Sequence, residues 1–176
     1  MANTNELIKE VTNRFVNITH TFNAPRELVF KAWTDIKLLE RWYAPRGCTI
    51  NFTQFSFREG GSFHSCIKSP NYHDCWCKGI YHEIITPERI VFSMHIADEK
   101  GNLLQPLDAG MDPEWPAETI VTVTFKEDGG RTILTLHQTV AESLAKRTGA
   151  YPSWIDMFDR LAGDLHVSKI LLTPNF

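Results

Sequence analysis

The apolar residues of this chain recur at two different periods, and the change of period marks the predicted elements. Residues 14–22 alternate between apolar and polar side chains, and their aromatic and β-branched content favours a first strand. From Pro25 the apolar positions follow helical spacing, which predicts a helix to about Thr34. Asp35 can then cap a second short helix over 36–42.

Alternation with a period of two returns after these helices and predicts six further strands. Gly-rich or Pro-containing turns separate most of them, so neighbouring strands should pair as hairpins. The predicted strands are 49–58, 62–68, 75–85, 89–97, 119–126 and 131–140. The segment 98–117 interrupts the series. It is rich in Gly, Pro and Asp, and we expect a long loop or lid there.

The last predicted element is an amphipathic helix. From about Ser153, the residues Trp154, Phe158, Leu161 and Leu165 repeat at helical spacing with charged residues between them. Such an apolar stripe needs a partner surface, and an antiparallel meander with one apolar face supplies it. The sequence therefore predicts an α+β fold in which a curved antiparallel sheet wraps around a long C-terminal helix.

The length of 176 residues fits one domain, since a chain of this size can bury about 70% of the surface that its unfolded form exposes. We expect that domain to span 14–170. Residues 1–13 are predicted to be a flexible N-terminal arm, and residues 171–176 a short C-terminal tail.

The composition limits the classes of partner and the cellular location that we expect. The net charge of −3 and the absence of a Lys/Arg cluster do not favour nucleic acid. The sequence contains no run of about 18 apolar residues, so we predict no membrane span. Its first residues also lack the apolar run of a secretory signal. We therefore expect a cytoplasmic protein whose four cysteines are reduced thiols.

Motifs along most of the chain resemble those of one protein family. They comprise a strand ending in Ala-Pro, a helix that bears an aromatic residue and a Trp, a Phe-Arg-x-Gly-Gly-x-Phe turn, and a Trp-bearing terminal helix. The matching residues are Phe22, Ala24, Pro25, Val29, Phe30, Ala32, Trp33, Thr34, Asp35, Leu38, Trp42, Tyr43, Pro45, Gly47, Phe57, Arg58, Gly60, Gly61, Phe63, Gly79, Tyr81, Glu83, Ile84, Pro87, Arg89, Ile90, Val91, Phe92, Trp154, Phe158, Asp159, Arg160 and Leu161.

In their order and spacing these residues resemble the activator-of-heat-shock-protein-90-ATPase homologue (AHSA-like) family of the START-like, or SRPBCC helix-grip, superfamily. The resemblance covers residues 14 to about 166. Two features depart from the family pattern: the 98–117 segment is longer than the usual link between strands, and the stretch His73-Asp74-Cys75-Trp76-Cys77 is not expected.

The resemblance implies a hydrophobic cavity between the sheet and the terminal helix, and it implies no conserved catalytic set. Aromatic rings suit the wall of such a cavity because they supply a large apolar area at low entropic cost. The alternative is that the same rings fill the core completely. The predicted ligand-binding residues are Trp33, Trp42, Phe63, Tyr81, Glu83, Phe92, Met94, Phe125, Trp154 and Phe158.

The second candidate site that the residues suggest is a metal site. In an extended strand His73, Cys75 and Cys77 point to one face, and Cys66 on a neighbouring strand is a conceivable fourth ligand. Structural zinc sites usually use Cys-x-x-Cys turns, and buried free cysteines usually serve packing. We therefore predict neither a metal nor another cofactor.

Acid and base chemistry is the third possibility, with Glu83, His82, His95 and His137 as candidates. Each stands alone on a strand, and the neighbours His82 and Glu83 should point to opposite faces. No nucleophile elbow, phosphate loop or paired catalytic carboxylates accompany them. We predict no catalytic residue.

The leading hypothesis is therefore noncatalytic binding of a small hydrophobic or lipid-like molecule, by a monomer or a homodimer. One alternative is a chaperone accessory in the stress response that resembles activators of heat-shock protein 90. Eukaryotic activators carry an additional N-terminal domain, for which residues 1–13 are too short. The other alternative is an enzyme similar to polyketide cyclases or isomerases.

Overall fold

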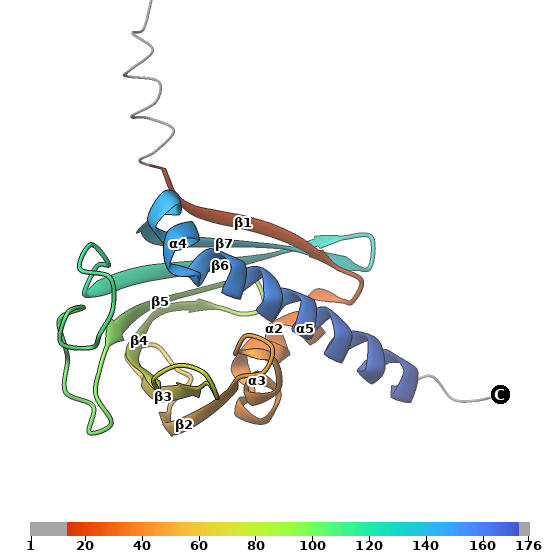
Figure 1. The fold of residues 1–176 in the computed structure, drawn as a ribbon. Coiled ribbons are helices and arrows are strands. Elements are labelled where there is room, and N and C mark those ends of the chain that lie inside the picture. The colour runs from red at the N-terminus through yellow and green to blue at the C-terminus, as the bar shows by residue number, and fades with distance from the viewer. Residues whose placement is uncertain (1–13, 173–176) are drawn as a thin grey trace, which may run out of the picture.

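Seven antiparallel strands form one curved sheet in the computed structural model, which describes residues 14–172 (Figure 1). The strand order is β1-β7-β6-β5-β4-β3-β2, so β1 and β2 are the two edges. The strands are β1 (Phe15–Phe22), β2 (Thr49–Phe55), β3 (Ser62–Lys68), β4 (Cys75–Ile85), β5 (Arg89–Ile96), β6 (Glu118–Asp128) and β7 (Arg131–Ala141). The predicted fold class is confirmed, while the predicted arm over 1–13 lies outside the described residues.

Four described helices pack on this sheet: α2 (Arg26–Thr34), α3 (Ile36–Trp42), α4 (Glu142–Thr148) and α5 (Ala150–Leu172). Asp35 caps α3 as expected, since its carboxylate accepts a hydrogen bond from Lys37 N at 3.0 Å. The sequence interpretation contained no α4, and it started the terminal helix three residues too late. Gly149 separates α4 from α5 with a φ of 86°, a left-handed conformation that glycine adopts without strain. None of the described helices has the length and apolar character of a membrane span.

The concave face of the sheet grips α5, as the periodicity predicted. Inward positions of β6 and β7, such as Val121 and Leu136, are completely buried, while the alternate positions are half exposed. Phe158 and Leu161 of α5 meet this face and are at most 1% exposed. Burying each such side chain contributes roughly 1.5–3 kcal/mol, so the stripe on α5 is a main source of stability.

A β-bulge in β4 changes which face its later residues occupy. Tyr81 pairs with Phe92, but the next pair is Glu83 with Val91, so one extra residue, His82, lies between them. Because a bulge adds one residue to a pattern of period two, Glu83 is turned to the outer face. There its carboxylate forms an ion pair with Arg89 at 3.3 Å.

Close packing between β3, β4 and β5 depends on Gly79. A Cβ atom at this position would lie 2.2 Å from the carbonyl oxygen of Ser93 and 2.3 Å from Cζ of Phe63. Both neighbours are buried and held by the sheet. Any side chain here would therefore push β4 away from its neighbours.

We predict that Gly79→Ala lowers the free energy of unfolding by about 1–3 kcal/mol, because the added methyl group overpacks the sheet. The matched control is Gly163→Ala in α5, where an added Cβ meets no atom within 4 Å. That substitution should raise stability by about 0.5–1 kcal/mol through helix propensity. Urea unfolding of both variants gives the comparison, and equal stability of Gly79→Ala and the wild type would contradict the packing described.

Candidate functional site

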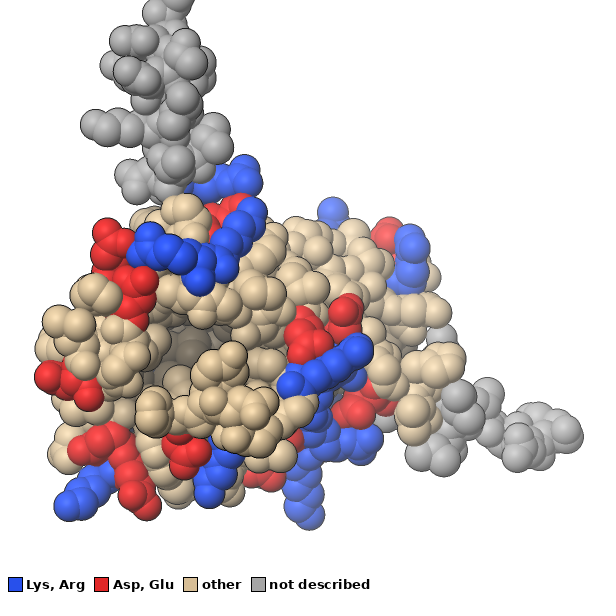
Figure 2. All heavy atoms as spheres, viewed as in Figure 1, with Lys and Arg blue, Asp and Glu red and all other residues tan. Residues whose placement is uncertain are grey.

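A cavity of about 720 Å³ lies between the N-terminal part of α5 and the sheet. Figure 2 shows it as a hollow in the surface. Strands β4 and β5 and the start of α5 form its walls, and its rim comes from the loops at 45–48 and 69–73, part of the 98–117 segment, and the corner between α4 and α5.

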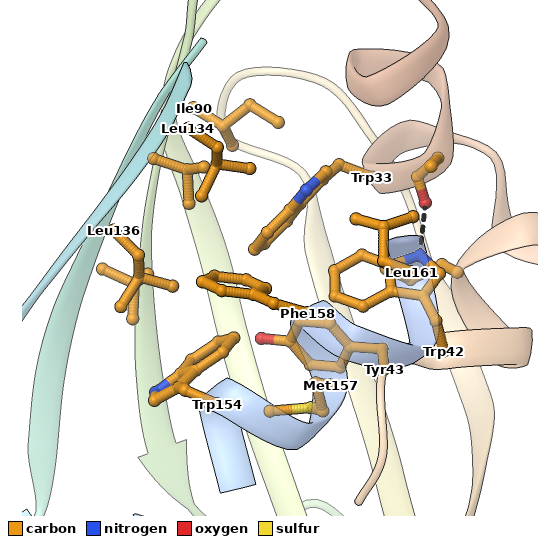
Figure 3. Close-up of a cluster of buried hydrophobic side chains, with 14 of the residues drawn as sticks. Trp33, Trp42, Tyr43, Ile90, Leu134, Leu136, Trp154, Met157, Phe158 and Leu161 are labelled. Carbon is orange, nitrogen blue, oxygen red and sulfur yellow. Dashed lines mark hydrogen bonds between the residues drawn. The ribbon is translucent and has the colours of Figure 1, made fainter. Parts of the chain in front are cut away.

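The other end of the space between sheet and helix is filled by aromatic side chains, and Figure 3 shows this cluster. Trp33 packs edge-on against Trp42, with ring centroids 4.8 Å apart, and Tyr43 packs edge-on against Trp154 at 5.6 Å. The Trp42 indole also donates a hydrogen bond to the carbonyl oxygen of Ala32 at 3.1 Å, which ties α3 to α2. A void of about 20 Å³ lies at this end, beside Trp33 and Tyr43.

The predicted ligand-binding residues divide between these two ends. Met94 and Trp154 line the large cavity. The four that line the small void are Trp33, Phe63, Tyr81 and Phe92. The three that belong to the buried hydrophobic core and border neither space are Trp42, Phe125 and Phe158. Glu83 lies on the outer face beside Arg89.

Thiols line the cavity and were not among the predicted ligand contacts. Cys48, Cys75 and Cys77 all border it. Burial, with a smaller contribution from Cys75, raises the pKa of the Cys77 thiol well above its ordinary value. A thiol whose pKa is raised remains protonated and is a poor nucleophile, so Cys77 acts as a small apolar wall residue.

The candidate metal ligands do not form a cluster in the described residues. His73 borders the cavity together with Cys75 and Cys77. Among residues 14–172, however, no group of three or more His, Cys, Asp or Glu side chains is placed to hold a metal ion. Cys66 is fully buried, and burial raises its pKa to about 11.

The candidate acid and base residues do not converge on the cavity. His95 borders it, but its Nε2 lies 2.9 Å from the carboxylate of Glu118 on the neighbouring strand. The ring of His137 packs edge-on against the exposed Phe15 at 5.9 Å. His82 is exposed at the bulge. Among the described lining residues, His95 is therefore the one candidate of the four, and the carboxylate that pairs with it, Glu118, lies outside the lining.

The sequence prediction also missed two buried polar residues at the cavity. Gln138 and Thr119 line it and are 3% and 2% exposed. The Trp154 indole donates to Gln138 Oε1 at 2.9 Å, and Gln138 Nε2 donates to Thr119 Oγ1 at 3.0 Å. The alternation of β6 and β7 could have found them, since both stand in phase with the inward positions Val121 and Leu136.

Comparison with known proteins agrees with this architecture. A solution structure of a protein from Staphylococcus epidermidis is 24% identical, covers 93% of this chain and 94% of its own, and superposes with a TM-score of 0.72. A protein from Arthrobacter aurescens is 21% identical, and the alignment covers 89% of this chain and 88% of that protein, with a TM-score of 0.75. The AHSA1 protein from Silicibacter pomeroyi is 17% identical, with coverage of 88% and 99% and a TM-score of 0.68. Similarities at this level establish the fold.

No protein with a curated description matches the chain significantly. The family described as "Activator of Hsp90 ATPase homolog 1-like protein" matches residues 23–165, which is most of the described domain. The match includes the three short helices α2, α3 and α4, six of the seven strands and the part of α5 that packs on the sheet. The chain therefore belongs to the AHSA1-like family.

Proposed function

We propose that this protein is a noncatalytic binding protein for a small, mostly apolar molecule that occupies the cavity between α5 and the sheet. The cavity itself is the observation that carries this proposal. Its volume of about 720 Å³ falls within the roughly 300–1,000 Å³ that is usual for small-molecule sites.

The chemistry of the wall supports an apolar occupant. Side chains such as Met94, Met157 and Trp115 supply apolar surface, and the neutral thiol of Cys77 adds to it. The cationic side chain at the rim, Arg46, is exposed and forms an ion pair with a carboxylate of α5 at 3.2 Å. Such a wall favours apolar surface over a charged ligand, because a buried charge needs a partner.

The partners of the reactive groups support binding without catalysis. His95, the acid or base candidate that lines the cavity, is already paired with Glu118 at 2.9 Å. Glu83, the strongest candidate for a base, is ion-paired with Arg89 on the outer face. The thiols of Cys66 and Cys77 are held in their neutral form by burial. An enzyme of the cyclase or isomerase type would need a general acid or base within hydrogen-bond reach of its substrate.

The chaperone alternative rests on the description of the family, which names activation of the Hsp90 ATPase. That activity would need a protein-binding surface rather than a cavity. Titration calorimetry against the chaperone of the same organism tests it. Heat of binding together with a higher ATPase rate would support it, and the absence of both would remove it.

We further propose that part of the 98–117 segment is a lid over the cavity. Met111 and Trp115 in this segment line the cavity. Arg147 of α4 forms ion pairs with Asp112, at 3.1 Å, and with Glu114. These contacts hold the segment against the corner between α4 and α5.

The cavity proposal predicts that N-phenyl-1-naphthylamine, an uncharged apolar fluorophore, binds with enhanced emission. Met94 and Ser153 lie on opposite walls of the cavity. Met94→Trp and Ser153→Trp should each weaken binding about threefold to tenfold, because each indole occupies part of the cavity and reduces the area that the ligand can bury there. Fluorescence titration gives the dissociation constants, and thermal unfolding shows whether the variants are folded.

The matched control is Ile80→Trp, which adds the same indole to an exposed position of β4 outside the cavity lining. It should leave the affinity unchanged. The absence of binding by the wild type would contradict the proposal. Equal affinity in the wild type and both cavity variants would show that the fluorophore binds elsewhere.

The lid proposal predicts that Arg147→Ala speeds release of the same fluorophore and cleavage of the 98–117 segment by limited proteolysis, by a few-fold each. Ion pairs of this exposure are weak, so the fold should remain intact. Arg131→Ala is the control, because Arg131 is similarly exposed and its ion pair with Asp128 lies in the β6–β7 turn. Stopped-flow displacement measures release.

The pH dependence gives a second check on the lid. The backbone N–H of Glu114 and then Arg147 lower the pKa of Asp112 below its ordinary value. The contact is therefore fully formed above about pH 4, the ordinary carboxyl range, and is lost as the pH falls through the lower folded value. Release from the wild type should approach that of Arg147→Ala only at such acidic pH. A difference between the two proteins that stays constant after NMR titration shows the Asp112 carboxylate to be protonated would contradict this role of Asp112.

A further inference from the structure

The hydrogen bonds of Trp154, Gln138 and Thr119 fix the orientation of a buried amide at the cavity. An indole N–H can only donate, so the Gln138 oxygen must face Trp154, at 2.9 Å. The Gln138 amide nitrogen must then face Thr119, whose hydroxyl oxygen accepts from it at 3.0 Å. The roles of all three groups follow from the donor-only character of Trp154.

This orientation leaves donors available at the cavity wall. Thr119 Oγ1 accepts from Gln138, and the described residues contain no acceptor that engages its own proton. The Gln138 amide nitrogen carries two hydrogens, of which Thr119 receives one. Both residues are at least 97% buried and line the cavity. A buried donor without an acceptor costs free energy, so this site is suited to a ligand that supplies one.

Tyr43 adds a third donor from the facing side. It borders the same cavity, and within the described part of the chain no hydrogen bond engages its hydroxyl. Figure 3 shows that hydroxyl directed toward the side of the cluster where Trp154 and Phe158 lie. Burial raises the pKa of Tyr43 well above its ordinary value, so the hydroxyl keeps its proton.

The charges around the cavity decide between a neutral and an ionised acceptor. Arg46, the one Lys or Arg side chain that lines the cavity in residues 14–172, is already paired with Asp156 at 3.2 Å. Of the two histidines in the lining, His95 is paired with Glu118 at 2.9 Å and His73 is exposed at the rim. A carboxylate bound next to Gln138 would therefore be buried without a free counter-ion, which is costly. A ketone, ester or amide oxygen accepts the same hydrogen bonds without that cost.

We infer that the cavity selects uncharged apolar molecules that carry a carbonyl oxygen, and that Thr119 and Gln138 bind this oxygen. This inference rests on the proposed function and specifies the class of ligand for the same cavity. Trp154 is a positioning residue, since it acts by orienting the amide of Gln138. The apolar body of the ligand lies against Met94 and Met157, which share the cavity.

The test compares three naphthalene probes that differ only in one substituent. The first is 6-propionyl-2-(dimethylamino)naphthalene, a ketone; the second is 6-propyl-2-(dimethylamino)naphthalene, in which a CH2 group replaces the carbonyl group; the third is 6-(dimethylamino)-2-naphthoate, an anion. We expect the wild type to bind the ketone about threefold to tenfold more tightly than the propyl analogue, as one net hydrogen bond allows. The anion should bind at least about tenfold more weakly than the ketone.

The decisive variants are Thr119→Val, which keeps the shape and removes the hydroxyl, and Thr119→Val combined with Gln138→Met. Preference for the ketone should fall in the first and vanish in the second, and the ketone's emission should shift to shorter wavelength as its carbonyl loses donors. Thr119→Ser should retain the preference. The matched control is Thr122→Val, which removes a hydroxyl from the opposite face of β6 and should change nothing.

The outcomes separate this inference from the proposed function. If no probe binds the wild type, both are wrong. If all probes bind but the wild type shows no preference for the ketone, or the double variant keeps that preference, the cavity binds ligands and the carbonyl selection is wrong. Tighter binding of the anion than of the ketone also overturns the selection. The probe without a carbonyl distinguishes loss of the hydrogen bond from general disturbance of the cavity, since such disturbance would weaken its binding as much as that of the ketone.

Discussion

The contact between α5 and the concave face of the sheet determines the rest of this structure. A seven-stranded sheet that curves around one helix encloses more space than the side chains of that helix can fill. Near the middle of α5 the remaining space is filled by α2 and α3, where Trp33 packs beside Phe158 and against Trp42. At the N-terminal end of α5 the rings of Tyr43, Trp115 and Trp154 line the space without filling it, and the cavity lies there. The filled end stabilises the fold, which allows the other end to remain open.

The wall of the cavity is mostly apolar, and the few polar groups that it presents are held in a defined state. Burial raises the pKa of Tyr43, Cys75 and Cys77 in its wall, so these groups keep their protons. The amide of Gln138 is held by Trp154, a residue that also packs against Tyr43, so one side chain joins the aromatic cluster to the polar part of the cavity. The environment that stabilises the core is therefore the one that sets which polar groups a ligand meets.

Much of the fold could be predicted from the sequence because it depends on short-range periodicity. The alternation over β6 and β7 and the helical stripe of Trp154, Phe158 and Leu161 are visible in the printed residues, and the structure confirms them. The bulge at His82 has no such signal, since it depends on how β4 pairs with β5, and it moves Glu83 to the outer face. The division of the interior into a filled and an open end also depends on three-dimensional packing. Aromatic content identified residues of the interior, and it could not distinguish Trp33 beside the small void from Trp154 beside the cavity.

The measurement that tests the account most directly is a crystal structure of the protein soaked with the naphthyl ketone. The account predicts electron density for one molecule between α5 and strands β4 to β6, with its carbonyl oxygen within hydrogen-bond distance of Thr119 or Gln138. A structure in which Met94, Met157 and Trp115 close the space, so that it contains no ligand density, would contradict the claim that the sheet and α5 enclose a binding cavity.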